Sequence, residues 1–318
     1  MSNYKISENS NSARRKNPWI RRGIIFFSSL LLIFIILLTV QFFIKRYNNT
    51  HITITTIKNA WNEYDYTKVY ELSKIYLQNN PYNNTALTYY SYACFFLAQA
   101  QTDTQASQSY LDDSINNMRI ALYNASKSLI PQLYYMLGCA YFYKNTITTH
   151  YYADLAVKYL KMAKDAGYVA DDISEYLGLS YASLGMTKES ISAFTEALLV
   201  RESDYLLLCI AEQYYTQKEY GAAKQYLYRV EKNSSNDELV VKSKNLLGQI
   251  YIEQDDLDSA QKEFDEILKM NPNSADAHYG LGLIHEKKGT LVAARSEWLK
   301  ALKLQLNHSG ALQKLQEN

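Results

Sequence analysis

Glycine and proline are scarce in this 318-residue sequence, which contains 11 glycines and 4 prolines. An all-β fold of short strands needs frequent turn residues, so this scarcity argues against that class. Apolar residues make up 47% of the chain, enough for a substantial core. The sequence has neither the G-x-x-x-x-G-K motif of nucleotide-binding loops nor the G-x-S-x-G motif of serine hydrolases.

Cysteine and histidine are equally few. Cys94, Cys139 and Cys209 lie far apart without a C-x-x-C pair, so this odd set is not a disulfide framework. We expect small buried side chains, and the sequence leaves open whether any two of them form a disulfide. His278 and His285 are seven residues apart, too far for the i, i+4 pair of helical zinc sites. No metal site and no cofactor is therefore predicted.

Acidic and basic residues are nearly balanced overall but unevenly distributed. Residues 1–44 hold six basic and one acidic residue, whereas residues 45–318 hold 27 basic and 31 acidic residues. The longer region lacks the excess of basic residues that a nucleic-acid surface needs. Three acidic pairs lack the calcium-loop pattern and are expected to cap helices or to interact with helix dipoles. They are Asp112-Asp113, Asp171-Asp172 and Asp255-Asp256.

One long run, residues 23–44, contains no charge and is dominated by Ile, Leu and Phe. As a helix rising about 1.5 Å per residue it would span roughly 33 Å, the thickness of a bilayer core. A buried soluble helix would keep a polar stripe, and a cleaved signal peptide would be shorter and end in a small-x-small site. The run therefore predicts an uncleaved transmembrane helix.

Basic residues flank this run unequally: five lie within 14–22, against Lys45, Arg46 and the more distant Lys58 beyond it. Basic flanks stay in the cytoplasm, so residues 1–22 are predicted to be a disordered cytoplasmic tail. The rest of the chain is then extracytoplasmic, facing the periplasm of a bacterium from its inner membrane.

A 34-residue period runs through the C-terminal half, where a glycine is followed by Ala or Ser twelve residues later and an aromatic residue sixteen later. Glycine inside a helix costs about 1 kcal/mol against Ala, so its return predicts a place where a neighbouring helix backbone comes close. The clearest sets are Gly248, Ala260, Phe264; Gly282, Ala294, Trp298; and Gly178, Ser190, Phe194. Gly138, Gly178, Gly248, Gly282, Ala260 and Ala294 are the predicted helix-crossing positions.

These residues resemble the tetratricopeptide repeat (TPR) family, closely in blocks 241–274 and 275–308 and more loosely toward the N-terminus. The resemblance implies an all-α solenoid of about seven helix pairs over 51–308, degenerate in 51–128 and regular in 129–308. A capping helix is expected at 309–318. We also expect a loop around 145–150, a linker at 99–109 and a poor first helix at Ile54–Glu63.

The resemblance further implies protein binding in a concave groove, with no room left for a catalytic domain. Family positions carried onto this sequence give the groove residues Tyr135, Phe142, Tyr143, Tyr205, Leu208, Glu212, Tyr215, Lys242, Asn245, Gln249, Glu253, Tyr279 and Glu286. This set departs from the Lys/Asn/Arg clamp that holds a C-terminal carboxylate in some relatives. Its aromatic residues could equally cover the inner wall without a ligand.

We therefore expect a non-catalytic, membrane-tethered scaffold that binds a protein or peptide partner in envelope assembly or secretion. Two alternatives stay open. One is a self-assembling structural component, hence a homo-oligomer, and the other is an accessory subunit of a separate membrane enzyme. The sequence identifies neither the partner nor the process.

Overall fold

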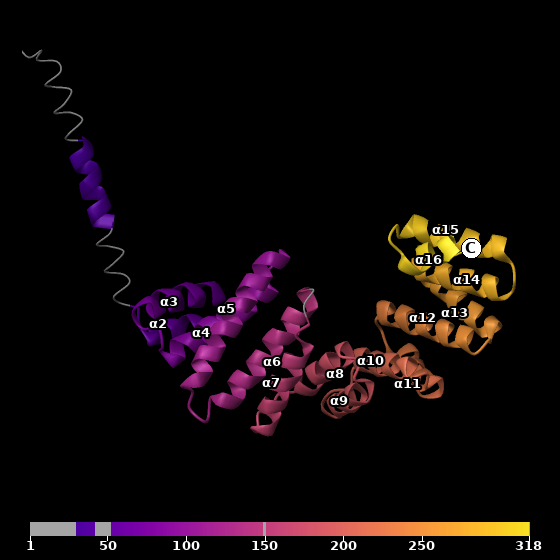
Figure 1. The fold of residues 1–318 in the computed structure, drawn as a ribbon, viewed down its shortest axis with the longest axis horizontal. Helices are drawn as coiled ribbons and strands as arrows, with labels where there is room; N and C mark the ends of the chain where they lie inside the picture. Colours follow the sequence, from indigo (N-terminus) through magenta and orange to yellow (C-terminus); the bar gives the residue numbers. More distant parts are fainter. Residues whose placement is uncertain (1–29, 42–51, 149–150, 318) are drawn as a thin grey trace, which may run out of the picture. The chain divides into compact units, whose positions relative to one another are not determined.

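The computed structural model describes residues 30–41, 52–148 and 151–317 (Figure 1). Beyond a helix at 30–41, these ranges form fifteen α-helices and no strand. This confirms the predicted all-helical solenoid. The helices are α2 (Ile54–Asn62), α3 (Tyr66–Asn79), α4 (Asn84–Gln99), α5 (Thr104–Tyr123), α6 (Ile130–Ile147), α7 (Ala153–Asp165), α8 (Ile173–Ser183), α9 (Thr187–Val200), α10 (Asp204–Thr216), α11 (Tyr220–Asn233), α12 (Asp237–Glu253), α13 (Leu257–Met270), α14 (Ala275–Lys287), α15 (Leu291–Leu304) and α16 (Ser309–Glu317).

Two units make up the chain, one ending at Pro81 and one starting at Tyr82. In the first unit, α2 packs against α3. In the second, the pairs are α4 with α5, α6 with α7, α8 with α9, α10 with α11, α12 with α13 and α14 with α15, and α16 packs against α15. Each pair thus consists of a first and a second helix in chain order.

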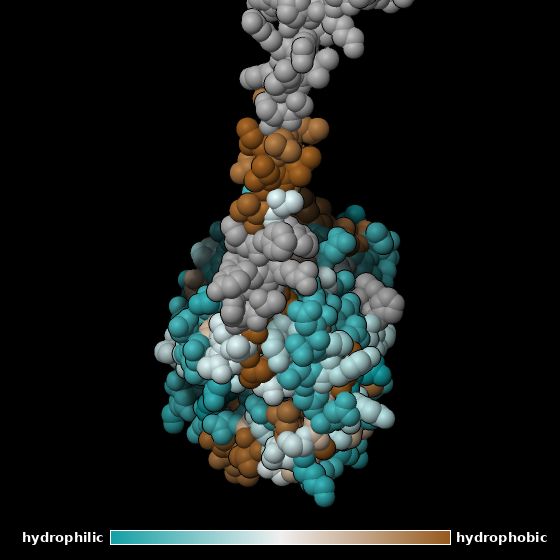
Figure 2. All heavy atoms as spheres, turned by 90° about the vertical axis from the view of Figure 1, so that its left-hand side faces the viewer, coloured by the Kyte–Doolittle hydropathy of each residue, from teal (hydrophilic) through white to brown (hydrophobic). Residues whose placement is uncertain are grey.

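Of the predicted transmembrane helix, residues 23–29 and 42–44 lie outside the described residues. The predicted tail at 1–22 lies wholly outside them. Residues 30–41 are helical, and their large apolar side chains are 47–61% exposed. Figure 2 shows this stretch as a column of brown, hydrophobic atoms. Within the described ranges, no helix has both the length and the hydropathy that a bilayer crossing requires.

Local capping explains why several helices begin where they do. Asp103 accepts from the backbone N–H groups of Gln105 and Ala106 at 3.2 and 3.1 Å, which places the start of α5 at Thr104. The expected linker at 99–109 is therefore wrong beyond residue 103. Thr53 likewise accepts from the N–H of Thr56 at 3.2 Å, so the segment expected to be a poor first helix is a regular one.

The extra length in the third pair was predicted as a loop around 145–150, but α6 continues to Ile147. The side-chain amide of Gln108 in α5 donates to the Ile147 carbonyl at 3.0 Å and thereby stabilises the last turn of α6. Much of the insertion therefore lengthens a helix.

The three acidic pairs differ in the contacts that their carboxylates make. Asp256 caps α13 as predicted, accepting from the N–H of Ser259 at 3.2 Å. Asp172 precedes α8 but accepts from the Tyr135 hydroxyl at 2.8 Å and makes no capping bond. Asp112 and Asp113 lie inside α5, so their predicted capping role is wrong. Their carboxylates instead pair with Lys144 and accept from the Tyr90 hydroxyl.

Second helices bury one residue, another four positions later and a third seven positions later, a spacing that forms one helix face. These triplets explain the sequence period, because each fills the space between the two helices of a pair and the next pair. They are Ser114, Met118, Ala121; Ala156, Leu160, Ala163; Ser190, Phe194, Ala197; Ala223, Leu227, Val230; Ala260, Phe264, Ile267; and Ala294, Trp298, Ala301.

In four of these six triplets, the large middle residue lies over a glycine of the first helix. A Cβ built on Gly248 would be 2.6 Å from Cζ of Phe264, and one built on Gly280 of the next pair would be 2.3 Å from the same atom. The Phe264 ring therefore contacts glycines of two consecutive pairs. The close neighbour at Gly248 is thus a ring and not the helix backbone that the sequence suggested.

The other predicted crossing glycines have equivalent neighbours. A Cβ on Gly178 would lie 2.5 Å from the Phe194 ring, and one on Gly282 would lie 2.3 Å from Nε1 of Trp298. At Gly138 the nearest atoms belong to the Leu160 side chain, with its backbone nitrogen 3.0 Å away. Ala260 and Ala294 are both fully buried.

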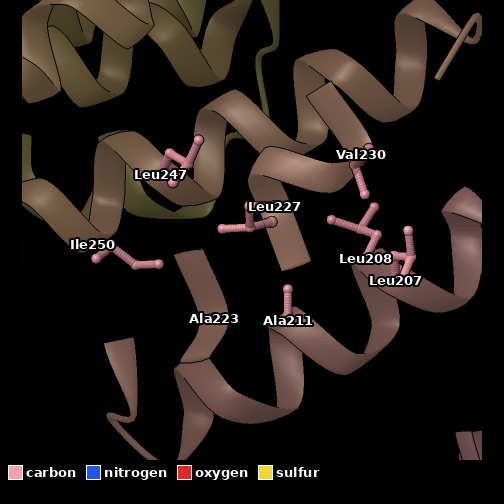
Figure 3. Packing of buried hydrophobic residues seen from close by; sticks show 8 residues of the cluster. All are labelled: Leu207, Leu208, Ala211, Ala223, Leu227, Val230, Leu247 and Ile250. Carbon is pink, nitrogen blue, oxygen red and sulfur yellow. The ribbon is translucent and has the colours of Figure 1, made fainter. Parts of the chain in front are cut away.

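Helices α10, α11 and α12 share one apolar cluster (Figure 3). Leu227 and Val230 of α11 pack with Leu208 of α10 and with Leu247 and Ile250 of α12. This cluster packs α10 against its neighbours, and α10 carries half of the residues that line the site described below.

A partly buried lysine also links three helices. Lys244 of α12 has its Nζ 3.2 Å from Glu231 of α11, and 3.2 and 2.7 Å from Glu263 and Glu266 of α13. Burial opposes its charge, but the hydrogen bond to Glu266 and the other two carboxylates together raise the pKa of Lys244. One cation thus holds three carboxylates at the junction of two pairs. Burial raises the pKa of Glu231, whereas the hydrogen bond from Lys244 lowers that of Glu266.

Candidate functional site

First helices of consecutive pairs contact one another along the second unit: α4 with α6, α6 with α8, α10 with α12, and α12 with α14. Within residues 82–317, α8 and α10 are the consecutive first helices that contact each other least. The contact between first helices is therefore weakest between α8 and α10.

A cavity of about 230 Å³ lies between α8 and α10. Its apolar lining comes from Leu179 and Ala182 of α8, Phe194 of α9, Leu208 of α10 and Leu239 of α12. Its polar lining comes from α10 and α12 and comprises Tyr205, Cys209, Glu212, Gln213 and Lys242. The structure thus brings together four predicted groove residues, namely Tyr205, Leu208, Glu212 and Lys242.

Glu212 is the carboxylate at this site, where its residue surface is exposed to solvent although the surrounding chain partly desolvates its carboxyl group. Among the described residues, no lysine, arginine or histidine forms an ion pair with it, because Lys242 places its Nζ 2.7 Å from Glu238 instead. Burial raises the pKa of Glu212, and the charge of Lys242 only partly opposes this. The cavity therefore has an apolar interior beside a carboxylate that has no cationic partner in the described chain.

Tyr205 stands beside this carboxylate with 42% of its surface exposed. Burial of its ring raises the pKa of Tyr205, and the nearby Cys209 thiol adds to that shift. Burial likewise raises the pKa of Cys209 to about 12. Both groups are therefore neutral at physiological pH, and Tyr205 can present a ring face and a hydroxyl donor.

The predicted groove residues of α6 are engaged within the protein. The Tyr135 ring stacks on Tyr168 at 4.8 Å, in addition to its hydrogen bond to Asp172. Phe142 and Tyr143 both pack on Tyr176 of α8, with ring centroids 5.0 and 6.2 Å away. These aromatic residues link α6 to α8 and cover the wall, which corresponds to the alternative left open by the sequence.

The predicted groove residues of α14 are covered by the C-terminal segment. Tyr279 packs on His308 with ring centroids 4.9 Å apart, and a Cβ on Gly310 would meet the Tyr279 ring at 2.6 Å. Glu286 pairs with Lys314 of α16 at 2.8 Å. The closing helix therefore occupies the end of the groove.

The remaining predicted residues lie between these two regions. Tyr215 is half-buried against Tyr220, and after burial the charge of Glu253 is the next cause that raises the pKa of Tyr215. Asn245 and Gln249 are half-buried on α12, and Glu253 is exposed at its end.

Sequence reasoning missed the α8 side of the cavity. Leu179 and Ala182 occupy, in block 171–204, the same first-helix positions that gave Glu212 and Tyr215 in block 204–237. The same family rule, applied to that block, would have found both. No equivalent signal exists for Phe194, whose position in the floor depends on its packing over Gly178.

The cysteines and histidines are separate from one another. Cys94, Cys139 and Cys209 are buried on α4, α6 and α10. His278 has its Nδ1 2.7 Å from Glu297, whereas His285 has its Nδ1 3.1 Å from the Thr290 hydroxyl. Each of these two histidines thus has a local hydrogen-bond partner.

Comparison with known proteins supports the repeat assignment. Residues 245–307 match the tetratricopeptide repeat family profile, and no curated protein matches the chain. The C-terminal part of a TPR repeat-containing protein from Cytophaga hutchinsonii shares the fold, with 13% identity, a TM-score of 0.59, and coverage of 83% of this chain and 99% of that one.

Two further solved structures are less similar. One is YrrB, a TPR protein with an unusual peptide-binding site (21% identity, TM-score 0.46, 63% and 97% of the two chains). The other is MamA (18% identity, TM-score 0.47, 58% and 91% of the two chains). Residues 245–307 therefore match tetratricopeptide repeats, and the fold shared with the Cytophaga protein shows that the described chain is an all-helical solenoid.

Proposed function

We propose that the second unit binds an extended segment of a protein partner at the cavity between α8 and α10, without catalysing a reaction. The observation that carries this proposal is the convergence of Tyr205, Leu208, Glu212 and Lys242 on one cavity, whereas the predicted groove residues of α6 and α14 are engaged within the chain. An exposed tyrosine beside an apolar hollow is the kind of anchor that dominates binding energy at interfaces.

Partner capture from native membranes tests this site. The double variant Tyr205→Ala, Tyr215→Ala should lose a partner that the wild-type protein retains. A matched control, Tyr123→Ala with Tyr151→Ala, removes two exposed tyrosines away from the cavity and should retain it. If the first variant melts like the wild type and retains every partner, the proposed site is refuted.

We further propose that residues 23–44 anchor the chain in a bacterial inner membrane, with residues 1–22 in the cytoplasm and the repeats in the periplasm. The support is the uncharged length of this run, the excess of basic residues before it, and the exposed apolar side chains of 30–41. A scaffold held in this way would serve envelope assembly or secretion by keeping its partner near the membrane.

Cysteine labelling tests the proposed topology. The native cysteines are buried, so an added one can be followed with a membrane-impermeant maleimide. Ser235→Cys should react in cells whose outer membrane alone has been permeabilised, whereas Ser10→Cys should react only after lysis. The opposite pattern would contradict this orientation.

A further inference from the structure

Some charged side chains along the groove form ion pairs within the described chain, and others do not. Lys242 pairs with Glu238 at 2.7 Å, and Lys287 pairs with Asp255 at 3.2 Å. Glu286 is neutralised by Lys314. Within the described residues, the predicted groove carboxylates that form no ion pair are Glu212 and Glu253. The accessible charge of the groove is therefore negative.

The cavity has the size of a side-chain pocket. Pockets for whole small molecules measure about 300–1,000 Å³, and this one measures about 230 Å³. Its apolar floor, formed by Leu179, Phe194 and Leu208, suits one large aliphatic or aromatic group. A complete small ligand would leave much of its surface in water.

An acidic group lies beside the cavity on α10. Leu208 and Glu212 are four residues apart, so they share one helix face, and Tyr215 follows one turn later. Glu212 itself lines the cavity, so a chain with its apolar group in the cavity has this carboxylate beside it.

We propose that the cavity takes a large apolar side chain of an extended peptide segment, and that an adjacent lysine or arginine of this segment binds Glu212. This inference rests on the proposed function and names the chemistry of its partner. An acidic segment would bring a second carboxylate against Glu212, and like charges in a partly desolvated site repel.

Heptapeptide pools with a fixed central pair test this proposal. The pools carry Leu-Arg, Leu-Gln, Leu-Glu or Ser-Arg, with both ends blocked so that the termini add no charge. Their binding to the full chain in detergent is followed by fluorescence anisotropy. We expect the Leu-Arg pool to bind about tenfold more tightly than the Leu-Gln pool, the gain typical of a hydrogen bond to a charged group. The Leu-Glu pool should bind most weakly of the Leu pools.

Two variants separate the charge from the cavity. Glu212→Gln should abolish the preference for Arg over Gln while keeping that for Leu over Ser. Ala182→Leu, which fills part of the cavity, should abolish the preference for Leu over Ser while keeping that for Arg over Gln. Glu189→Gln makes the same chemical change as Glu212→Gln at an exposed position of α9, and it should alter neither of the two preferences. Thermal unfolding followed by circular dichroism verifies that each variant is folded.

The outcomes distinguish the chemistry from the site. If the Leu-Glu pool binds as tightly as the Leu-Arg pool, or if Glu212→Gln keeps the Arg preference, the inferred partner chemistry is overturned while the site stands. If no pool binds the wild type more tightly than the Tyr205→Ala, Tyr215→Ala variant, the binding site itself is refuted.

Discussion

Replacing Lys244 with methionine should destabilise the protein far more than replacing Glu231 with glutamine. Methionine keeps the apolar length of the lysine side chain but removes the one cation among Glu231, Glu263 and Glu266. Glutamine at position 231 instead removes one of three like charges, and it does so where burial already disfavours the ionised form.

The size of the loss follows from the charges left behind. Only 13% of the Lys244 side chain is exposed, and removing one partner of a buried ion pair costs about 3–5 kcal/mol. The folded protein can limit this cost by protonating one carboxylate, which at pH 7 requires roughly 3.7 kcal/mol for a glutamate of ordinary pKa. We therefore expect Lys244→Met to lose about 2–4 kcal/mol at pH 7. Glu231→Gln should stay within about 1 kcal/mol of the wild type or exceed it.

Urea unfolding at pH 7 and pH 5 provides the test. At pH 5 protonating one carboxylate costs only about 1 kcal/mol, so the deficit of Lys244→Met should shrink there. The raised pKa of Glu231 means that its contribution to wild-type stability grows as the pH falls through its folded value. The lowered pKa of Glu266 acts oppositely, because its contribution is lost as the pH falls through its folded value.

A result with equal losses for Lys244→Met and Glu231→Gln would refute this reasoning. So would a Lys244→Met deficit that is unchanged between pH 7 and pH 5, since the cost would then come from packing and not from charge. Glu189→Gln, at an exposed position of α9, is the matched control for removing a carboxylate.

Three further predictions concern packing, backbone and binding. Gly280→Ala should cost about 1–3 kcal/mol in urea unfolding, because its Cβ would overlap the Phe264 ring, and combining it with Phe264→Leu should cost less than the sum of both changes. Lys218 has a left-handed φ of 62°, so Lys218→Gly should stabilise the protein by up to about 1 kcal/mol, and a loss of stability would contradict this. Because burial raises the pKa of Glu212, binding of the Leu-Arg pool should weaken on acidification at a higher pH than for an ordinary glutamate, and Glu212→Gln should remove this dependence.

Most of the fold was predictable because its signals are local. A glycine, a small residue and an aromatic residue at fixed spacing report the packing of two neighbouring helices, as in Gly248, Ala260 and Phe264. The first helix at Ile54–Asn62 was underestimated because it lacks that signature, although the Thr53 cap and two buried residues suffice to form it. The insertion near residue 145 was placed in a loop because sequence spacing alone does not distinguish a longer helix from a longer loop.

The site was less predictable because it depends on contacts distant in sequence. Tyr279 and Glu286 occupy the expected groove positions, yet α16 covers them. The cavity at Tyr205 is lined by residues of α8, α9, α10 and α12, so no single repeat encodes it. Family positions therefore identified candidate side chains, while the structure determined which of them are accessible.

The Phe264 ring has a consequence for how the number of repeats can change. Excising residues 241–274, one full period, would join α11 directly to α14 and leave Leu227 to face Gly280 where the larger ring had been. The unfilled volume would destabilise the new junction by roughly 24 cal/mol for each Å³. Loss of this repeat therefore costs less when the Phe264 ring and both of its glycines are removed together, so the unit that packs as a whole here is offset from the period visible in the sequence.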